Sequence, residues 1–416
     1  MSNSEHISAE SFAISGGHRP SDAMNSIKAP IYQTSTFQFN TAEEGKAFFE
    51  QAAGGSSLEE RNGSLIYTRL NHPNAITAEK RLARLDGAED AAFFSSGMAA
   101  ISNTILTFCH AGDLILLSSP LYGGSDAFVK KHLIDYDVQW LEFEPGATAD
   151  DIRQLLAEHP RKDRLKMIYL ETPANPTLSL TDISMLNRLK EEWQKEGEEI
   201  IIAVDNTYMG PIFQKPLAHG ADINLYSATK YLGGHSDLIA GAASGSEKHL
   251  NLIKSKRTLL GSLISPFTAW LLSRSMETVS LRMEKQAQTA SKLAHHFQSH
   301  DKINTFYHLD LLPENHPDAS LFKKQYSSGG AMMAFEVKGG EAEAFRFLNA
   351  LKTVHLAISL GSTETLASHP YTMSSSNMAE SDRLKNGITP ALVRVSVGLE
   401  SVDDLIKDFE QALYKV

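Results

Sequence analysis

The chain contains the stretch Tyr226-Ser-Ala-Thr-Lys-Tyr-Leu-Gly-Gly234, in which Lys230 follows two hydroxyl residues and precedes two glycines. A short apolar run, 223–226, leads into it. A lysine amine can form a Schiff base with the aldehyde of pyridoxal phosphate (PLP), and neighbouring hydroxyls can hold the phosphate of that cofactor. A lysine in a turn rich in Ser, Thr and Gly can equally be a solvated surface residue. The rest of the sequence must therefore supply the other parts of a PLP site.

The composition is that of an ordinary globular protein, with 416 residues of which 42% are hydrophobic and 21% charged. This length suffices for two or three domains and a large buried core. The net charge of −11 disfavours a general nucleic-acid binder or a membrane-surface protein, because both need a basic face. We therefore expect neither nucleic acid nor membrane as a partner. We also assign no residue to a metal site.

A single cysteine, Cys109, excludes an intramolecular disulfide and fits a reducing compartment. The first residues lack the basic start and apolar core of a signal peptide, and no apolar run approaches the roughly 20 residues that span a membrane. These features predict a cytoplasmic protein. Cys109 ends the apolar run 105–109, which predicts a buried helical cysteine, with a catalytic thiol as the alternative.

Apolar strands alternate with helices from about Thr77 onward. The predicted strands are 91–94, 113–117, 166–170, 200–204 and 223–226, and the predicted helices are 77–85, 98–108 and 186–193. Continuous apolar strands separated by helices indicate parallel strands that are covered on both faces. The sequence therefore predicts an α/β fold with a mostly parallel central sheet.

The two ends of the chain differ from this pattern. The first 65 or so residues are polar and predicted to be irregular, with a flexible loop at 51–57. Beyond Pro266 we predict a smaller C-terminal α+β domain, and a polar loop near the surface or the site entrance. Its predicted elements are a long helix over 267–283, strands over 331–337 and 392–397, helices over 341–351 and 402–414, and the loop 371–388.

Polar residues stand at the carboxyl ends of the predicted strands. They are Ser96, Gly97, Glu171, Asp205, Ser227 and Lys230. Ligands of open α/β sheets bind along that edge. We therefore expect these residues to share one site.

Two of these positions suit particular parts of PLP. Ser95-Ser-Gly-Met-Ala99 opens a helix directly after a strand, where free N–H groups and the helix dipole attract a phosphate and Gly97 allows close backbone approach. An ordinary helix cap is the alternative. Asp205 ends a buried strand and could keep the pyridine nitrogen protonated. Its alternative role is to cap the following turn.

Four residues outside that set are also candidates. Tyr122, in a Leu-Tyr-Gly-Gly turn beyond a strand, could stack on the cofactor or simply form the turn. Arg394 is a charge within an apolar strand, which suits a substrate carboxylate or a structural ion pair. Tyr67 and Arg69 fall on one side of an extended segment, which can also be a plain surface strand.

An ordered set of segments extends over nearly the whole chain. They are Pro30-Ile-Tyr-Gln-Thr-Ser-Thr-Phe37, Tyr67-Thr-Arg69, Ser95-Ser-Gly-Met98, Leu121-Tyr-Gly-Gly124, Tyr169-Leu-Glu-Thr-Pro-Ala-Asn-Pro176, Val204-Asp-Asn-Thr207, Ser227-Ala-Thr-Lys-Tyr-Leu-Gly-Gly-His235, Ser359-Leu-Gly361 and Val393-Arg-Val-Ser-Val-Gly-Leu-Glu400. This set resembles the Cys/Met-metabolism PLP enzymes, also called the trans-sulfuration family. That family includes methionine γ-lyase, cystathionine γ-synthase, cystathionine γ- and β-lyases and homoserine-ester sulfhydrylases.

The resemblance implies a cofactor role for each candidate. Lys230 is the Schiff-base lysine and later moves protons, and Asp205 pairs with the ring nitrogen. Asn175 supports the ring hydroxyl, and Tyr122 stacks on the ring and takes part in proton transfer. The phosphate is held by Ser96, Gly97, Met98, Ser227 and Thr229.

The resemblance also implies how substrate and subunits are arranged. Arg394 binds the substrate carboxylate, with Ser359 beside it. Tyr67 and Arg69 reach the phosphate of a neighbouring subunit, which implies a homotetramer built from two dimers with shared active sites. The implied PLP-dependent transferase type I fold has an N-terminal arm, 1–65, that contacts the neighbouring subunit. A large PLP-binding α/β domain, 66–265, and a C-terminal α+β domain, 266–416, follow.

Within the family, the reaction is predicted from fewer residues. Methionine γ-lyases usually carry a cysteine where this chain has Gly124, and Lys-Asp where it has Arg257-Thr258, whereas 359–370 is similar to the methionine γ-lyase and sulfhydrylase versions. We predict a carbon–sulfur lyase that eliminates the γ-substituent of methionine or a related amino acid, giving a 2-oxo acid, ammonia and a thiol. The main alternative is γ-replacement, by a cystathionine γ-synthase or an O-acetyl- or O-succinylhomoserine sulfhydrylase. A cystathionine γ- or β-lyase, an aminotransferase and a non-enzymatic PLP-binding protein are further alternatives.

Overall fold

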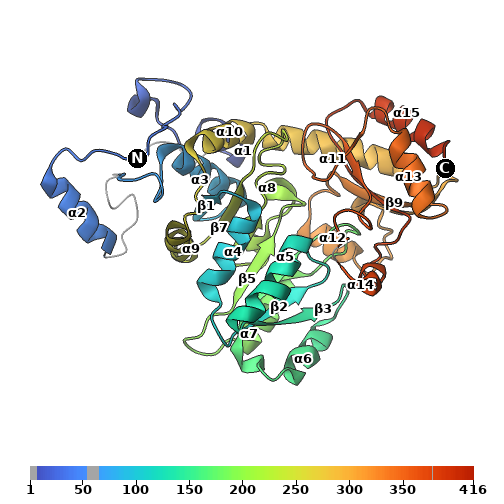
Figure 1. The fold of residues 1–416 in the computed structure, drawn as a ribbon, viewed down its shortest axis with the longest axis horizontal. Coiled ribbons are helices and arrows are strands. Elements are labelled where there is room, and N and C mark those ends of the chain that lie inside the picture. The colour runs from blue at the N-terminus through green and yellow to red at the C-terminus, as the bar shows by residue number, and fades with distance from the viewer. Residues whose placement is uncertain (1–6, 54–64, 377) are drawn as a thin grey trace.

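Two β-sheets with their covering helices make up the computed structural model, which describes residues 7–53, 65–376 and 378–416 (Figure 1). The larger sheet lies in the first two thirds of the chain, and the smaller one belongs to the C-terminal third. The long helix α11 (Val279–Phe297) runs from the first region into the second (Figure 1). Within the described ranges, no helix combines the length and apolar character that a membrane crossing requires.

The larger sheet has seven strands in the order β1-β7-β6-β5-β4-β2-β3. Their bounds are β1 Asp90–Phe94, β2 Leu114–Ser118, β3 Gln139–Phe143, β4 Leu165–Glu171, β5 Ile201–Asp205, β6 Ile223–Tyr226 and β7 Gly241–Gly245. Only β7 runs against its neighbours, pairing antiparallel with both β1 and β6. The prediction of a mostly parallel central sheet is therefore confirmed, and six strands send their carboxyl ends to the same edge.

Both faces of this sheet are covered. Ile115 and Leu117 of β2 pack into one apolar cluster with α4, whereas Leu114 and Leu116 pack into another with α6 and α7. This alternation explains why the strand is apolar throughout. The helices around this sheet are α3 Pro73–Asp86, α4 Gly97–Phe108, α5 Gly123–Ala127, α6 Ala149–Glu158, α7 Ile183–Trp193, α8 Gly210–Phe213 and α9 Glu247–Leu260, with short helical turns at Phe128–His132, Leu133–Tyr136, Lys162–Arg164 and Pro216–His219.

The smaller sheet has the order β10-β11-β12-β9-β8. Its strands are β8 Ile303–Tyr307, β9 Met332–Val337, β10 His355–Leu356, β11 Leu366–Ser368 and β12 Leu392–Ser396. Val393 and Val395 of β12 pack against α11, α13 (Glu341–Ala350) and α15 (Val402–Leu413). Because side chains alternate along a strand, Arg394 faces the opposite side. The remaining elements of this region are Leu309–Leu311, α12 Ala319–Gln325 and α14 Glu380–Lys385.

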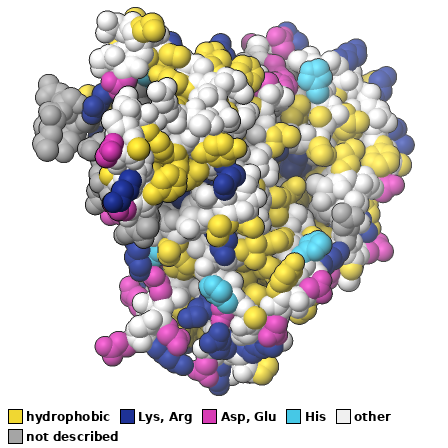
Figure 2. Space-filling view, turned by 60° about the vertical axis from the view of Figure 1, so that its left-hand side comes forward, with side chains coloured by type: hydrophobic (Ala, Val, Ile, Leu, Met, Phe, Trp, Pro, Cys, Tyr) yellow, Lys and Arg dark blue, Asp and Glu magenta, His cyan; other side chains and the backbone are white. Residues whose placement is uncertain are grey.

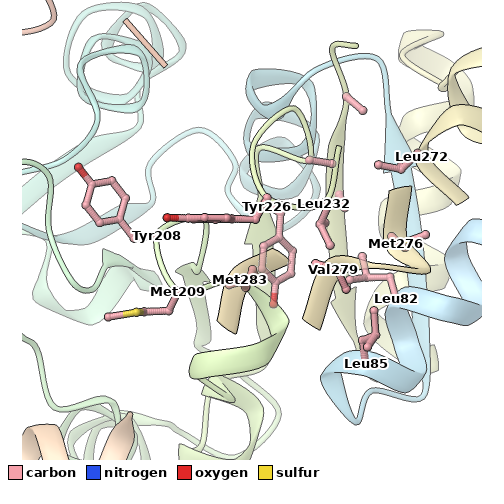
Figure 3. Close-up of a cluster of buried hydrophobic side chains, with 14 of the residues drawn as sticks. Leu82, Leu85, Tyr208, Met209, Tyr226, Leu232, Leu272, Met276, Val279 and Met283 are labelled. Atoms are coloured by element: carbon pink, nitrogen blue, oxygen red, sulfur yellow. The ribbon is translucent and has the colours of Figure 1, made fainter. Parts of the chain in front are cut away.

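One buried cluster joins the two regions. Figure 3 shows members of it from α3, from the segment after β5 and from the two helices α10 (Pro266–Met276) and α11. Leu82, Tyr208, Tyr226, Met276 and Met283 all belong to it and are buried. The apolar contact across the boundary places the smaller sheet beside the strand ends of the larger one.

The predicted single helix 267–283 is wrong, because the chain forms two helices separated at Glu277 and Thr278. The Arg282 side chain donates a hydrogen bond to the carbonyl of Ser275 at 2.9 Å and another to the carbonyl of Tyr231 at 2.9 Å. The first bond takes a carbonyl that a continuous helix would use for its own ladder. The Arg282 side chain thus bonds to the last turn of α10 at the place where the two helices separate.

Three further local predictions differ from the structure. The N-terminal segment is not simply irregular, because it forms α1 (Ala9–Ser15), a short turn at Pro20–Ala23 and α2 (Ala42–Ala53). The predicted loop 51–57 begins inside α2, and its part from 54 onward lies outside the described residues. The predicted loop 371–388 contains α14. Strands β3, β7, β8, β10 and β11 were not predicted from the sequence.

Close backbone contact fixes β7 against the start of α4. A Cβ atom at Gly241 would lie 2.0 Å from the carbonyl oxygen of Ser96 and 2.9 Å from the Cα of Gly97. Such distances leave no space for any side chain. The absence of a side chain at Gly241 therefore sets the position of the first turn of α4.

We expect Gly241→Ala to destabilise the protein by about 1–3 kcal/mol, because the added methyl group must push backbone away rather than a movable side chain. Urea denaturation followed by circular dichroism measures this change. Gly340→Ala is the matched control, since a Cβ there meets nothing within 4 Å and its φ is not positive. Equal midpoints for the two variants would contradict the prediction.

Candidate active site

The structure brings the predicted strand-end residues together. The Thr207 hydroxyl donates to the Asp205 carboxyl at 2.6 Å and accepts from the Ser227 backbone N–H at 2.8 Å. A Cβ atom at Gly97 would lie 2.9 Å from the Cβ of Ser227, so the start of α4 is in contact with the turn that carries Lys230. The ends of β1, β5 and β6 therefore form one site, as the sequence predicts.

The Lys230 amine is mostly buried and lies at the boundary of the two regions. It donates a hydrogen bond to the Ser359 hydroxyl at 2.8 Å. Burial, with a smaller contribution from the nearby Arg394 guanidinium, lowers the pKa of Lys230 to about 8. A lysine with this pKa is partly unprotonated near neutral pH, which is the form that attacks an aldehyde.

Two buried carboxyls, Asp205 and Glu171, stand at paired positions of adjacent strands. Burial raises the pKa of both side chains, and the Asp205 charge raises that of Glu171 further, to about 8. Thr207 donates two hydrogen bonds to Asp205, through its N–H at 3.0 Å and its hydroxyl at 2.6 Å, and the Tyr169 hydroxyl also lowers the pKa of this carboxyl. No cation of the described residues acts on either carboxyl. The Asp205 carboxyl is therefore suited to pair with a positively charged atom of a ligand.

The N-terminus of α4 has the geometry of an anion site. Ser96 is the N-cap, and its hydroxyl accepts from the Ala99 N–H at 3.1 Å. The N–H groups of Gly97 and Met98 lie in the first turn and have no intrahelical acceptor. Thr229 lies nearby, but its hydroxyl is bonded to the backbone N–H of Ala240 at 3.0 Å and to the carbonyl of Ala240 at 3.2 Å.

Arg394 is buried without a charged partner. Its guanidinium donates to the Ser359 carbonyl at 3.0 Å and to the Asn175 amide oxygen at 3.4 Å, and its Nε has no partner among the described residues. The Tyr208 hydroxyl also donates to that amide oxygen, at 2.5 Å. A structural ion pair, the alternative from the sequence, is not formed within the described chain. A carboxylate ligand would satisfy this guanidinium.

Ser359, which contacts both cations, has a strained backbone. Its φ is +120°, in a region that residues with a side chain rarely adopt. Its hydroxyl faces Lys230 and its carbonyl faces Arg394. Strain of this kind persists where surrounding contacts enforce it, and it clusters at ligand sites.

The ring of Tyr122 is half exposed at the rim of the site. Its backbone N–H donates to the Glu171 carboxyl at 2.8 Å, which fixes the start of α5. A Cβ atom at Gly124 would lie 2.6 Å from this ring and 3.0 Å from the Met98 sulfur. The sequence predicted Tyr122, but it gave no role to Glu171, Thr207 or Tyr208. Thr207 and Glu171 lie within the motifs that carry the family resemblance, but the sequence does not show which groups their side chains contact.

Tyr67 and Arg69 stand apart from these residues. Both are exposed, and the Arg69 guanidinium lies 5.8 Å from the Tyr67 ring centre. The same guanidinium donates to the Thr258 carbonyl at 2.8 Å. Arg257, the neighbouring residue, is fully buried and pairs with Glu79 at 2.7 Å. The Arg257 side chain therefore has a structural role and is not open to a substrate.

Neither a catalytic cysteine nor a metal site is indicated by the described residues. Cys109 is buried just beyond α4, and burial raises the pKa of its thiol, which disfavours the thiolate of a catalytic cysteine. Among residues 7–53, 65–376 and 378–416, no group of three His, Cys, Asp or Glu side chains could hold a metal ion.

The donor set fits PLP. Uncapped N–H groups suit its phosphate, the buried Asp205 carboxyl suits its ring nitrogen, and the Lys230 amine suits its aldehyde. A model of the Cys/Met metabolism PLP-dependent enzymes matches residues 10–414. The chain belongs to this family. Its cofactor is PLP, and the predictions of family, fold and cofactor are confirmed.

Relatives of known activity cover almost the whole chain. The chain is 41% identical to L-methionine γ-lyase of Porphyromonas gingivalis over 96% of each protein. It is 32% identical to O-succinylhomoserine sulfhydrylase of Pseudomonas aeruginosa, over 99% of this chain and 96% of the relative. The crystal structure of cystathionine γ-lyase from Lactobacillus plantarum, complexed with L-serine, superposes with a TM-score of 0.86 at 32% identity and 99% coverage of both chains. The chain is therefore an enzyme of this family.

We expect the Lys230 amine of the apoprotein to react with acetic anhydride with an apparent pKa near 8. At that pH about half of its amines are unprotonated, against under about one in a hundred for an ordinary lysine. Competitive labelling over pH 6 to 11, read by peptide mass spectrometry, measures this. Exposed lysines in the same digest report the reagent's own pH dependence, and coincident curves for Lys230 and those lysines would contradict the expectation.

Proposed function

We propose that the chain is a PLP-dependent carbon–sulfur lyase that converts methionine, or a related sulfur amino acid, and water into a 2-oxo acid, ammonia and a thiol. The observation that carries the proposal is the 41% identity with a methionine γ-lyase over 96% of each chain. The identity with a sulfhydrylase is 32%. The difference favours elimination over replacement.

The cofactor would be held by the residues that meet at the strand ends. When bound, PLP supplies an electrophilic aldehyde and a ring that withdraws electrons from the substrate α-carbon. Lys230 would hold the aldehyde, Asp205 would keep the ring nitrogen protonated, and Tyr122 would cover the ring. The phosphate would be held by Ser96, Gly97, Met98, Ser227 and Thr229, and the ring hydroxyl would contact Asn175.

The substrate would be oriented by the smaller sheet. Arg394, on the face of β12 turned from its own core, offers N–H groups to the α-carboxylate, with Ser359 beside it. The Lys230 amine, with a pKa of about 8, can take a proton from the α-carbon of the substrate and then donate it to another carbon of the same molecule. The Ser359 hydroxyl holds that amine at 2.8 Å, on the side of the carboxylate site. The half-exposed Tyr122 phenol is the second group that can exchange a proton at this edge.

The main alternative is γ-replacement, in which a thiol takes the place of the departing group. It shares these residues, and Gly124 is the observation in its favour, since methionine γ-lyases usually have a cysteine there. Arg257 does not support γ-replacement in the same way, because its side chain is buried.

We also propose that active sites are shared within a homotetramer of two dimers in the cytoplasm. Each subunit would have an N-terminal arm, 1–65, a PLP-binding domain, 66–265, and a C-terminal domain, 266–416. The arm would contact the neighbouring subunit, and Tyr67 and Arg69 would approach the phosphate that the neighbour's PLP-binding domain holds. Two observations support it. Figure 1 shows α2 standing away from both sheets, and Figure 2 shows apolar side chains gathered on one face of the molecule. Met24, Ile27 and Phe267 are 100%, 84% and 52% exposed, which a covering subunit would explain.

The reaction is tested with the purified enzyme loaded with PLP. Methionine, cystathionine and O-acetyl- and O-succinylhomoserine are each incubated with and without a thiol, and 2-oxobutanoate and ammonia are measured. We expect 2-oxobutanoate from methionine without added thiol. Product that forms only when ester and thiol are both present would reject the lyase and establish replacement.

Shared sites are tested by mixing two inactive variants. Lys230→Ala removes the catalytic amine, and Arg69→Ala removes the cation that would reach the neighbour. If sites are shared, mixed dimers contain one site with both residues intact, so activity of the co-expressed pair should return to about a quarter of wild type when subunits mix at random. Activity no higher than that of the better single variant would contradict shared sites.

A further inference from the structure

Glu171 has no part in the proposed reaction, yet its carboxyl contacts two loops that border the site. It is 6% exposed and ends β4 directly beside the end of β5. Its carboxyl accepts the Tyr122 backbone N–H at 2.8 Å, and the Asn175 backbone N–H is close enough to this carboxyl to lower its pKa. A buried acidic group without a cationic partner is costly, which points to a specific use.

The two backbone groups belong to loops with different tasks. Tyr122 follows β2 and presents its ring at the rim of the site. Asn175 follows β4, and its side-chain oxygen lies 3.4 Å from the Arg394 guanidinium and 2.5 Å from the Tyr208 hydroxyl. One carboxyl thus holds the ring that would cover the cofactor and the amide that borders the carboxylate site. The Glu171 backbone is itself anchored, since its N–H donates to the Ser118 hydroxyl at 3.1 Å.

We propose that Glu171 is a positioning residue, whose carboxyl reaches across the strand ends to fix the Tyr122 and Asn175 loops around Asp205. The inference rests on the proposed function, because it assumes that PLP occupies this edge of the sheet. Glu171 acts through these two loops and not on the reacting atoms. Reach and hydrogen-bond acceptance, rather than negative charge, are the properties that the role requires.

The charges around Glu171 agree with a neutral acceptor. The titratable groups that face it are Asp205 on β5, Tyr169 on its own strand and Tyr208 beyond β5. None of them is a cation, and Asp205 opposes a second negative charge. Burial, and next the Asp205 charge, raise the pKa of Glu171 to about 8, so this carboxyl is mostly protonated at neutral pH and leaves the negative charge to Asp205.

The test compares two conservative variants. Glu171→Gln keeps the length of the side chain and its acceptor oxygen but cannot ionise. Glu171→Asp keeps the acid but is one methylene shorter, so its oxygen withdraws from the Tyr122 N–H. PLP affinity of each apoprotein is measured by titration, together with the circular dichroism of the bound cofactor and the melting temperature of the apoprotein.

We expect Glu171→Gln to bind PLP within about threefold of wild type with an unchanged dichroism spectrum. Glu171→Asp should bind PLP about tenfold more weakly, with reduced dichroism, because a buried hydrogen bond to the loop is lost. In steady-state assays, Glu171→Asp should lower kcat more than it raises KM, since Arg394 keeps its shorter bond, to the Ser359 carbonyl at 3.0 Å. A Glu171→Asp protein equal to wild type, or a Glu171→Gln protein as impaired as Glu171→Asp, overturns the proposal.

Asp408→Asn is the matched control for a merely structural buried carboxyl. Asp408 is 4% exposed, lies in α15 and accepts backbone N–H groups of residues 352 to 354 at 2.8 to 3.2 Å. This variant should lower the melting temperature and leave PLP affinity and dichroism unchanged. If wild-type apoprotein fails to bind PLP, the proposed function fails; if wild type binds PLP and the Glu171 variants match it, only this inference fails.

Discussion

The separation of opposite charges in a buried site is the constraint on which the active centre depends. Lys230 and Arg394 bring two cationic groups to one side with no carboxylate between them, while Asp205 and Glu171 bring two acids to the other with no cation between them. Each group is buried, so the protein alone leaves part of its electrostatics uncompensated. A cofactor that carries a cationic nitrogen and a substrate that carries a carboxylate would compensate both halves. The fold holds the Arg394 guanidinium apart from the two acids because Arg394 is fixed to the smaller sheet, whereas Asp205 and Glu171 are fixed to the larger one.

Backbone, more than side chains, sets the dimensions of this site. Gly97 and Gly241 allow α4 to lie so near β7 and the Lys230 turn that added Cβ atoms would fall within 2.9 Å and 2.0 Å of their nearest neighbours. Ser359 holds a φ of +120° so that one residue can face both Lys230 and Arg394. These features bring free N–H groups, a hydroxyl and a carbonyl to fixed places without relying on flexible side chains. A rigid frame of this kind favours ligand binding because little freedom remains to be lost.

The sequence predicted the strand ends well because a buried parallel strand is apolar throughout and stops where the polar ligand edge begins. It therefore placed Asp205, Gly97 and Lys230 at this edge, and the ordered motifs added Arg394 and Ser359 as candidates. What it missed depends on contacts between distant segments. The break between α10 and α11 coincides with Arg282 bonding to Ser275 and Tyr231, and the helices of the N-terminal segment arise in a polar stretch with weak periodicity. Glu171 was visible as an edge residue, but its bond to the Tyr122 backbone joins positions in different motifs and has no local signature.

Elimination and replacement would use the same cofactor-binding and carboxylate-binding residues. The choice between the two reactions must therefore depend on other residues. In the proposed function Lys230, Asp205 and Arg394 would serve every step up to departure of the γ-substituent, so they would not favour water or a thiol as the next reactant. Access to the site can. Gly123 and Gly124 follow the Tyr122 ring, and the Ser374 carbonyl would lie 3.5 Å from a Cβ at Gly123. The segment that contains Ser374 leads into α14, whose Lys385 pairs with Glu144 of the larger domain at 2.6 Å. These residues border the Tyr122 ring from both domains, and the chain lacks a side chain at two successive positions beside that ring.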